Sequence, residues 1–135
     1  KRKISALPLT ERKIINTPKA PAPIGPYNQA VFIRDTLYVS GQIALNPENQ
    51  ELVMANIKEE TRQVMKNLEA ILLAANFTFL NVVKCTIFLK DMDDFPVVNE
   101  VYGQFFSDQA PARETVAVKT LPKNVNVEIS CIAIA

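Results

Sequence analysis

The chain of 135 residues is 48% hydrophobic and 21% charged, a composition typical of one globular domain. Its 15 Lys and Arg residues and 14 Asp and Glu residues leave a net charge of +1, which is too small to attract nucleic acid or an anionic membrane over long range. No apolar run approaches the roughly 18 residues that a membrane-spanning helix needs. We therefore expect no nucleic-acid partner and no membrane partner.

Two features that the sequence lacks exclude whole classes of chemistry. The chain contains no His, which excludes Ser-His and Cys-His catalytic pairs and His-ligated metals. Its three Gly residues, Gly25, Gly41 and Gly103, form neither a P-loop nor a dinucleotide fingerprint. Cys85 and Cys131 are too few for a four-cysteine metal site, and each lies in an apolar run typical of a buried, reduced thiol. We expect no metal, no cofactor and a reducing compartment, the cytoplasm.

Residues 1–17 differ from the rest of the chain. They begin with the basic sequence KRKIS, contain no acidic residue before Glu11 and show no clear periodicity. We interpret them as an N-terminal arm, which is an expression tag, a frayed end or the remnant of an organelle-targeting segment. The last alternative places the protein in mitochondria. Residues 18–135 are expected to form a single domain, which opens with a stiff Pro-rich loop over residues 18–26.

The first half of this domain predicts a hairpin followed by a long helix. Strands are expected over residues 30–34 and 37–45, joined by a short turn. Asn56 is a good N-cap, and apolar residues then recur at helical spacing as far as Ala75, where Asn76 offers a stop. The charged residues expected largely on the opposite side of this helix are Glu60, Arg62, Lys66 and Glu69.

The second half of the domain predicts a strand, a helix and two more strands. Residues 82–90 are rich in β-branched and aromatic side chains, which is typical of a central strand. Asp93 or Asp94 is expected to cap a second helix that tolerates a proline in its first turn. Strands over residues 114–121 and 125–135 complete the order ββαβαββ.

This order predicts an α+β fold, in which two helices pack on one face of a single mixed β-sheet and form a two-layer sandwich. The opposite face of the sheet then needs a cover of its own, and oligomerisation provides one. The sequence contains no repeat, no low-complexity tract and no linker to a second domain.

Glu128 is the most conspicuous polar residue of the expected strands. It lies in the apolar sequence VNVEISCIAIA, and a carboxylate without a partner is costly to bury. Alternation along the strand separates Val125, Val127, Ile129, Cys131 and Ala133 on one face from Asn126, Glu128, Ser130, Ile132 and Ile134 on the other. Glu128 therefore either lines a polar notch on a mainly apolar face or is an ordinary salt-bridged or exposed residue. Periodicity alone favours the second interpretation.

Other polar residues also have both a functional and an ordinary interpretation. Arg113 directly precedes a strand, where its planar fork suits a substrate carboxylate, although a surface Arg at a strand end is equally common. Tyr27 follows a Gly-Pro turn and either closes a pocket or packs in the core. Ser40-Gly41 interrupts an apolar strand, which indicates either close approach of a ligand to the backbone or a β-bulge. Asn99, inside the second helix, faces either a ligand or water.

Several blocks of the sequence are distinctive when they are taken together. They are IGPYNQAV, LYVSGQIALNP, NVVKCTIFLKDMDDFPVVNEVY, PARETVAV and LPKNVNVEISCIAIA. In order and spacing they resemble the reactive-intermediate deaminase family, also called the YjgF/YER057c/UK114 family. Because the resemblance extends over residues 22–135, it is far more specific than any single motif.

The resemblance implies a chorismate-mutase-like domain that forms homotrimers, with a site in each cleft between neighbouring subunits. Arg113 stands at the Arg of the family's PAR motif, which holds the substrate carboxylate. Glu128 stands at the acid of its VEI motif, which positions or activates water and moves protons. The residues implied to line the pocket are Tyr27, Ser40, Gly41 and Asn99.

Two positions depart from the family pattern. Thr115, which we count among the substrate-binding residues, stands where some members have a Cys near the site, so a thiol-dependent role is not expected there. Ser130 replaces the second acid of the common VEIE ending and leaves Glu128 as the only carboxylate on that strand.

The activity that the resemblance implies is hydrolysis of reactive enamine and imine acids to 2-keto acids and ammonia. Examples are 2-aminoacrylate/2-iminopropanoate and 2-aminocrotonate/2-iminobutanoate. Because an imine is already electrophilic, the reaction needs only a clamp for the carboxylate and a group that delivers water. The alternative is a non-catalytic trimer that binds small carboxylic acids and regulates a partner protein. A role in RNA cleavage or translation inhibition, ascribed to some members, is disfavoured by the near-neutral charge and the lack of His.

Overall fold

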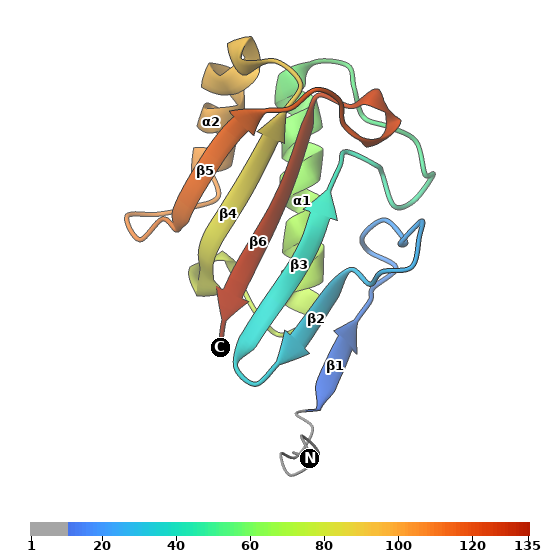
Figure 1. Ribbon diagram of the computed structural model, residues 1–135, viewed down its shortest axis with the longest axis vertical. Coiled ribbons are helices and arrows are strands. Elements are labelled where there is room, and N and C mark those ends of the chain that lie inside the picture. Colours follow the sequence, from blue (N-terminus) through green and yellow to red (C-terminus); the bar gives the residue numbers. More distant parts are fainter. Residues whose placement is uncertain (1–10) are drawn as a thin grey trace, which may run out of the picture.

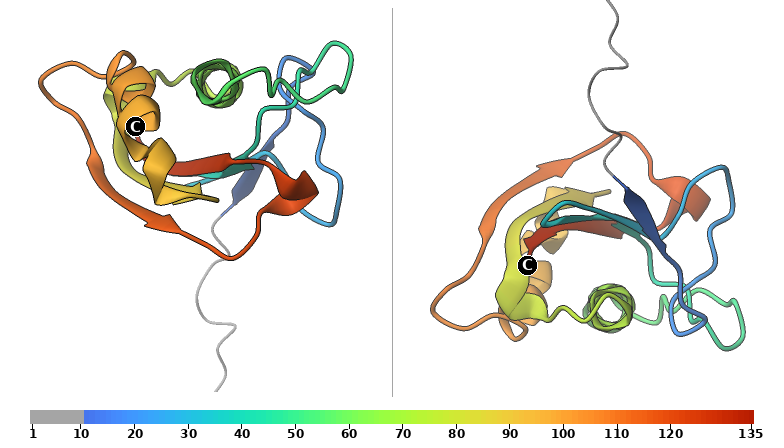
Figure 2. Two further views of the ribbon diagram at one scale, coloured as in Figure 1. Left: turned by 90° about the horizontal axis from the view of Figure 1, so that it is seen from above. Right: turned by 90° about the horizontal axis from the view of Figure 1, so that it is seen from below.

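The computed structural model describes residues 11–135, which fold into one six-stranded sheet with two helices on one of its faces (Figures 1 and 2). The strands are β1 (Arg12–Ile15), β2 (Ala30–Ile33), β3 (Thr36–Gln42), β4 (Val82–Leu89), β5 (Ala112–Ala117) and β6 (Val127–Ile134). The helices are α1 (Ile57–Ala74) and α2 (Phe95–Gly103), and the short 3-10 turns are η1 (Phe79–Asn81), η2 (Met92–Asp94) and η3 (Pro122–Asn124). The expected α+β two-layer arrangement is confirmed.

The sheet has the strand order β1-β2-β3-β6-β4-β5. Only the β4–β5 pair is parallel, and the other neighbours are antiparallel. The last strand of the chain, β6, therefore lies in the middle of the sheet between β3 and β4. Figure 1 looks onto the face without helices, and Figure 2 shows both helices on the opposite side.

The alternation expected for β6 is confirmed. Val127, Ile129, Cys131 and Ala133 are buried against the helices, whereas the residues between them are partly exposed on the helix-free face. The buried set joins Val64, Leu68 and Ile71 of α1 in the main core. Burial of side chains of this size contributes roughly 1.5–3 kcal/mol each.

Strand β1 was not expected, because it lies within the segment interpreted as an arm. Arg12–Ile15 pairs antiparallel with β2, and Ile15 is buried. The observed order is therefore βββαβαββ, and the expected boundary after residue 17 is not the edge of the folded region. Four residues, two of them basic, carry little periodic signal, and backbone pairing with β2 makes them a strand. The interpretation of residues 1–10 lies outside the described residues.

Several strand boundaries also differ from expectation: β5 ends at Ala117 instead of residue 121, and β6 begins at Val127 instead of residue 125. Strand β5 begins at Ala112 instead of Glu114, because Ala112 and Arg113 already pair with Lys84 and Cys85 of β4. Arg113 thus lies within a strand and does not precede one. Strand β3 ends at Gln42, and its register against β6 shifts between Val39 and Gln42, so that the expected interruption at Ser40-Gly41 is present.

The helix ends follow their expected signals, with one change at each helix. The Asn56 side chain accepts a hydrogen bond from the Glu59 N–H, and Asn76 has the positive φ of a residue that ends a helix. Before α2, the capping carboxylate is that of Asp91, which accepts from the Asp93 N–H of η2. Glu60 was expected largely on the solvent side of α1 but is fully buried.

Neither helix of residues 11–135 is long and apolar enough to cross a membrane.

The helix-free face of the sheet presents apolar side chains to solvent. Tyr38 of β3 is 50% exposed and Val116 of β5 is 46% exposed, and both alternate with residues that face the helices. Ile14 of β1, which pairs with Val31, adds to this surface. Exposed apolar side chains on one face of a sheet are a feature that oligomerisation can cover.

Candidate functional site

A cavity of about 200 Å³ contains three of the predicted site residues, Tyr27, Gly41 and Glu128. The loop before β2 contributes Tyr27, the bulge in β3 contributes Gly41, and the central strand β6 contributes Glu128. The remaining lining residues are mainly apolar: Pro21, Ala22, Ile24, Gln29, Gln42, Ile43, Leu45 and Pro122. Small cavities with mostly apolar walls and a few converging polar groups are typical ligand sites.

Glu128 has no hydrogen-bond or ion-pair partner among the described residues, although it is half-buried. Burial raises the pKa of its carboxyl above the ordinary glutamate value. A raised pKa brings a carboxyl closer to the range in which it exchanges protons at neutral pH. The interpretation of Glu128 as the polar member of a notch on an apolar face agrees with this environment.

Gly41 is required by the position of Glu128. A Cβ atom at residue 41 would lie 2.9 Å from Cδ of Glu128 and closer still to its Oε2. A contact of that length is not tolerated, so any side chain at residue 41 displaces the carboxyl. The missing side chain thus makes room for the protein's own carboxyl group at the wall of the cavity.

Tyr27 and Ser40 are held together by the loop that joins them to the sheet. The Ser40 hydroxyl donates to the Asn28 carbonyl (2.7 Å), and the Ser40 N–H donates to the Gln29 carbonyl (2.9 Å). Tyr27 is 47% exposed, and its hydroxyl accepts a long hydrogen bond from the Ile24 N–H (3.4 Å). Tyr27 and Ser40 also share a shallow depression next to the cavity.

Gln29 organises this loop and was not singled out from the sequence. Its buried side-chain amide accepts from the Thr17 N–H (2.7 Å) and donates to the carbonyls of Thr17 (3.0 Å) and Pro21 (2.9 Å). These bonds replace the regular backbone pairing that the Pro-rich segment lacks. No periodic signal marks Gln29, because it lies in a loop.

Asn67 supports the opposite wall and was also missed. Its side-chain amide is buried and donates to the carbonyls of Ile43 (3.0 Å) and Leu45 (2.9 Å), two residues that line the cavity. A signal for it existed, since Asn67 adjoins the apolar stripe of α1 at Val64 and Leu68. A polar residue beside such a stripe either contacts solvent or binds a backbone group.

Arg113 lies elsewhere, on the helix side of the sheet. Its guanidinium carbon is 5.0 Å from the ring centre of Tyr102 and 5.4 Å from that of Phe95, both on α2. Its Nη1 donates to Oδ1 of Asn99, also on α2, at 2.7 Å. No carboxylate among the described residues pairs with Arg113. The helix thus orients the guanidinium and leaves its other N–H groups for a ligand.

The buried hydroxyl of Thr115, two residues beyond Arg113 on β5, has no hydrogen-bond partner among the described residues. The hydroxyl of Tyr102 lies in the same part of the fold, next to the thiol of Cys85. Burial raises the pKa of Tyr102 as well as those of the neighbouring thiols of Cys85 and Cys131. These groups are therefore uncharged at neutral pH, and Arg113 is the only charged side chain among those named here.

The two predicted catalytic residues project from opposite faces of the sheet. Arg113 pairs with Cys85, which pairs with Cys131, so these three side chains share the helix side. Glu128 lies three positions from Cys131 in a regular strand and therefore projects from the helix-free face. A single chain thus places Arg113 next to Asn99 on one side of the sheet, and Glu128 with Tyr27 and Gly41 around a cavity on the other.

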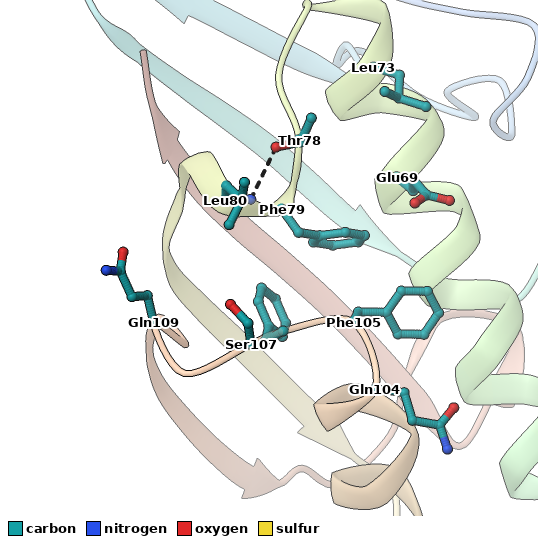
Figure 3. A pocket seen from close by; sticks show the side chains of 10 residues that line it. Glu69, Leu73, Thr78, Phe79, Leu80, Gln104, Phe105, Ser107 and Gln109 are labelled. Atoms are coloured by element: carbon teal, nitrogen blue, oxygen red, sulfur yellow. Dashed lines mark hydrogen bonds between the residues drawn. The ribbon is translucent and has the colours of Figure 1, made fainter.

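A second, larger cavity of about 500 Å³ contains none of the predicted site residues (Figure 3). It lies between α1, η1 and the segment after α2, and its aromatic residues Phe79, Phe105 and Phe106 pack against one another. Within residues 11–135, no cluster of His, Cys, Asp and Glu has the composition of a metal site.

Comparisons with known proteins identify the family. A family model described as Endoribonuclease L-PSP matches residues 17–135. The chain belongs to this family. It is the same group as the YjgF/YER057c/UK114 family that the sequence motifs resemble.

Members of the family are similar to this chain over nearly its whole length. The human protein named 2-iminobutanoate/2-iminopropanoate deaminase is 47% identical over 123 residues, which are 91% of this chain and 90% of the human one. A Yersinia pestis protein of the Rid family superposes with a TM-score of 0.90 at 44% identity, over 93% of this chain and all (100%) of that one. Escherichia coli TdcF with bound serine superposes with a TM-score of 0.86 at 41% identity, over 91% of this chain and 98% of that one.

Gly41→Ala tests the packing of Glu128 against β3. We expect the new methyl group to push the carboxyl into water, so that the raised pKa of Glu128 falls towards its ordinary value. Because a flexible side-chain end yields and not the backbone, the free energy of unfolding should fall by less than the roughly 1–3 kcal/mol typical of overpacking. Carboxyl NMR titration and urea unfolding measure the two quantities.

Gly103→Ala is the matched control, because a Cβ atom there meets nothing within 4 Å. It should leave the titration of Glu128 unchanged. An unaltered Glu128 pKa in Gly41→Ala would show that the carboxyl does not occupy the space beside residue 41.

Proposed function

We propose that the protein hydrolyses short 2-imino acids and their enamine tautomers to 2-keto acids and ammonia. One observation carries this proposal: the chain keeps a guanidinium and a half-buried carboxyl without charged partners among the described residues. Unpaired charges are costly to hold in a fold and are common at functional sites. The name of the human relative and the serine bound to its E. coli relative support a small substrate with a carboxylate and a nitrogen.

Arg113 is proposed to bind the substrate carboxylate. The rings of Phe95 and Tyr102 and the amide of Asn99 hold the guanidinium from one side. The remaining N–H groups present a planar fork that matches two carboxylate oxygens. A clamp of this kind places C2 of the imine at a constant position relative to the attacking water.

Glu128 is proposed to handle the protons of the reaction. Its carboxylate accepts a proton from water as the water oxygen bonds to C2 of the protonated imine, whose nitrogen carries two hydrogens, and the C=N electron pair moves to nitrogen. The resulting carbinolamine expels ammonia when Glu128 returns the proton to nitrogen and the second oxygen-bound proton leaves to solvent. The products are the keto acid and ammonia, and atoms balance without an oxidant, a metal or a cofactor.

Two copies of the chain are proposed to complete each site. A three- or four-carbon acid does not reach through a sheet, and Arg113 and Glu128 lie on its opposite faces. Arg113 stands on β5, an edge strand, from which a neighbouring subunit is accessible. We therefore infer that Arg113 of one subunit faces the Glu128 cavity of the next, and the apolar helix-free face supplies contact area.

A homotrimer satisfies this geometry. An interface between two different surfaces of the same chain repeats head to tail, and it closes into a ring when the rotation allows. The family resemblance supports a ring of three subunits with three equivalent sites. In the proposed closed ring, neighbouring subunits would also cover the helix-free face, on which Tyr38 and Val116 are exposed in the single chain.

An RNA substrate, which the description of the family model suggests, has less support in this chain. Metal-free ribonucleases depend on general acid–base groups, most often His, and this sequence has none. The net charge of +1 offers little attraction for a polyanion. The proposed substrate is therefore the small imine acid.

The proposed activity is tested with an imine acid that an amino-acid oxidase generates in the assay and semicarbazide traps. We expect the wild type to lower the trapped signal and Arg113→Ala to lower kcat/KM by roughly 100-fold or more, because the carboxylate loses its clamp. Arg62→Ala, which removes an Arg paired with Glu59 on α1, is the control and should keep full activity.

If the wild type and Arg113→Ala lower the trapped signal equally, only the clamp role of Arg113 is wrong. If neither of them lowers it, the proposed activity is wrong. Binding of a small carboxylic acid to the wild type alone would then favour the alternative of a regulatory carboxylate-binding trimer.

Mixing two inactive variants tests the shared site. Arg113→Ala and Glu128→Gln are each expected to be inactive, because each lacks one of the two functional side chains. After unfolding and refolding together in equal amounts, about a quarter of the sites in a ring should combine an intact Arg113 with an intact Glu128. Recovered activity near that fraction supports a shared site. Activity that stays at the level of the separate variants would show that both residues act within one chain.

A further inference from the structure

Glu60 is a fully buried carboxylate that the proposed reaction does not use. Its relative exposure is 0%, and it lies on the core-facing side of α1. Both of its oxygens accept hydrogen bonds from one residue: Oε2 from the main-chain N–H of Asn126 and Oε1 from the Asn126 side-chain amide, each at 2.8 Å. Burial of a carboxylate in the core is costly, so these two bonds are a strong constraint on Asn126.

Asn126 immediately precedes β6 and is held from a second direction as well. Its carbonyl accepts a hydrogen bond from the N–H of Lys90, the residue after β4 (3.0 Å). Glu128 follows only two residues later. The first turn of α1 lies at the end of the sheet where β6 begins and β3 ends (Figure 1). The helix therefore reaches the strand at the point where the strand enters the cavity wall.

The segment before Asn126 needs such an anchor. Lys123 and Asn124 have positive φ values of 54° and 55°, a conformation that non-glycine residues adopt only when their surroundings hold them. Pro122 at the start of this segment and Glu128 beyond its end both line the cavity. Asn126 lies between these two wall residues, so its position determines how they face each other.

We infer that Glu60 is a positioning residue for Glu128, acting through its paired hydrogen bonds to Asn126. This inference rests on the proposed function, since it assigns Glu60 to the reaction that Glu128 performs. Glu60 does not touch the cavity and contributes no group to the chemistry. It holds the start of β6 so that the Glu128 carboxyl stands beside Gly41, whereas the carboxylate clamp at Arg113 is independent of it.

Glu60→Leu breaks the constraint with a side chain of similar size. Leucine has no acceptor oxygen, so both donors of Asn126 lose their partner. We expect kcat to fall on the order of tenfold while KM, which depends on Arg113, stays nearly constant. Because Glu128 loses its buried position, its raised pKa should also fall towards the ordinary glutamate value.

Glu59→Gln is the matched control. Glu59 precedes Glu60 on the same helix, but its carboxylate pairs with Arg62 at the surface. Loss of an exposed ion pair changes stability little. This variant should keep the wild-type kcat, KM and Glu128 titration.

A second substitution distinguishes positioning from loss of folding. In Glu60→Gln, the glutamine oxygen accepts from the main-chain N–H of Asn126, and the Asn126 side-chain amide turns so that its oxygen accepts from the glutamine NH₂. Both hydrogen bonds are kept, so we expect kcat near that of the wild type. Glu60→Leu that melts earlier but keeps full kcat at a temperature where it is folded would overturn the inference.

Carboxyl NMR of Glu128, assigned with Glu128→Gln, keeps this test separate from that of the proposed function. If the wild type has no deaminase activity, the proposed function fails, and a displaced Glu128 titration in Glu60→Leu still supports positioning. If the wild type is active and neither kcat nor the titration responds to Glu60→Leu, only the positioning role is wrong.

Discussion

The register of β6 is the constraint on which the rest of the structure depends. This strand lies between β3 and β4, and both neighbours hold it by backbone hydrogen bonds. Because a strand alternates with a period of two, a slip of one residue would move Val127 and Ile129 to solvent and Glu128 into the core. The free energy that burial of the apolar residues contributes therefore also determines where the carboxyl lies.

The same register separates the two functional side chains. Strand β5 pairs with β4 in parallel and places Arg113 beside Cys85, on the side of the helices. There α2 orients the guanidinium through aromatic rings and one amide. The carboxyl stands on the other face, next to a bulge whose glycine leaves room for it. The guanidinium of Arg113 and the carboxyl of Glu128 therefore lie on opposite surfaces of the sheet.

Buried polar side chains hold the irregular segments that surround the cavity. Gln29 binds the Pro-rich loop, Asn67 binds the residues after β3, and Glu60 binds the start of β6. Loops contribute few backbone pairs of their own, and each of these side chains supplies hydrogen bonds in their place. Two of the three come from α1. This helix is therefore both the main partner of the sheet in the core and the support of two cavity walls.

Local patterns in the sequence were sufficient for most of the fold. The stripe of α1, its Asn56 cap and the alternation of β6 each depend on residues close together in the chain, and each was predicted correctly. The short strand β1 and the start of β5 were not, because pairing with distant strands decides them. Glu60 shows the limit most clearly. Its spacing from Val64 places it on the buried stripe, but only its partner Asn126, which is remote in sequence, explains why a carboxylate is stable there.

The sequence by itself determined the family, the two-layer architecture and the set of residues worth testing. Its motifs and periodicities involve residues that are close together in the chain, so they can be recognised without the structure. Only the tertiary structure decided that Arg113 and Glu128 face away from each other, that Asn99 contacts Arg113, and that Gly41 makes room for a carboxyl. Each of these relations joins segments far apart in sequence through strand register and helix packing, and no single stretch of residues contains that information.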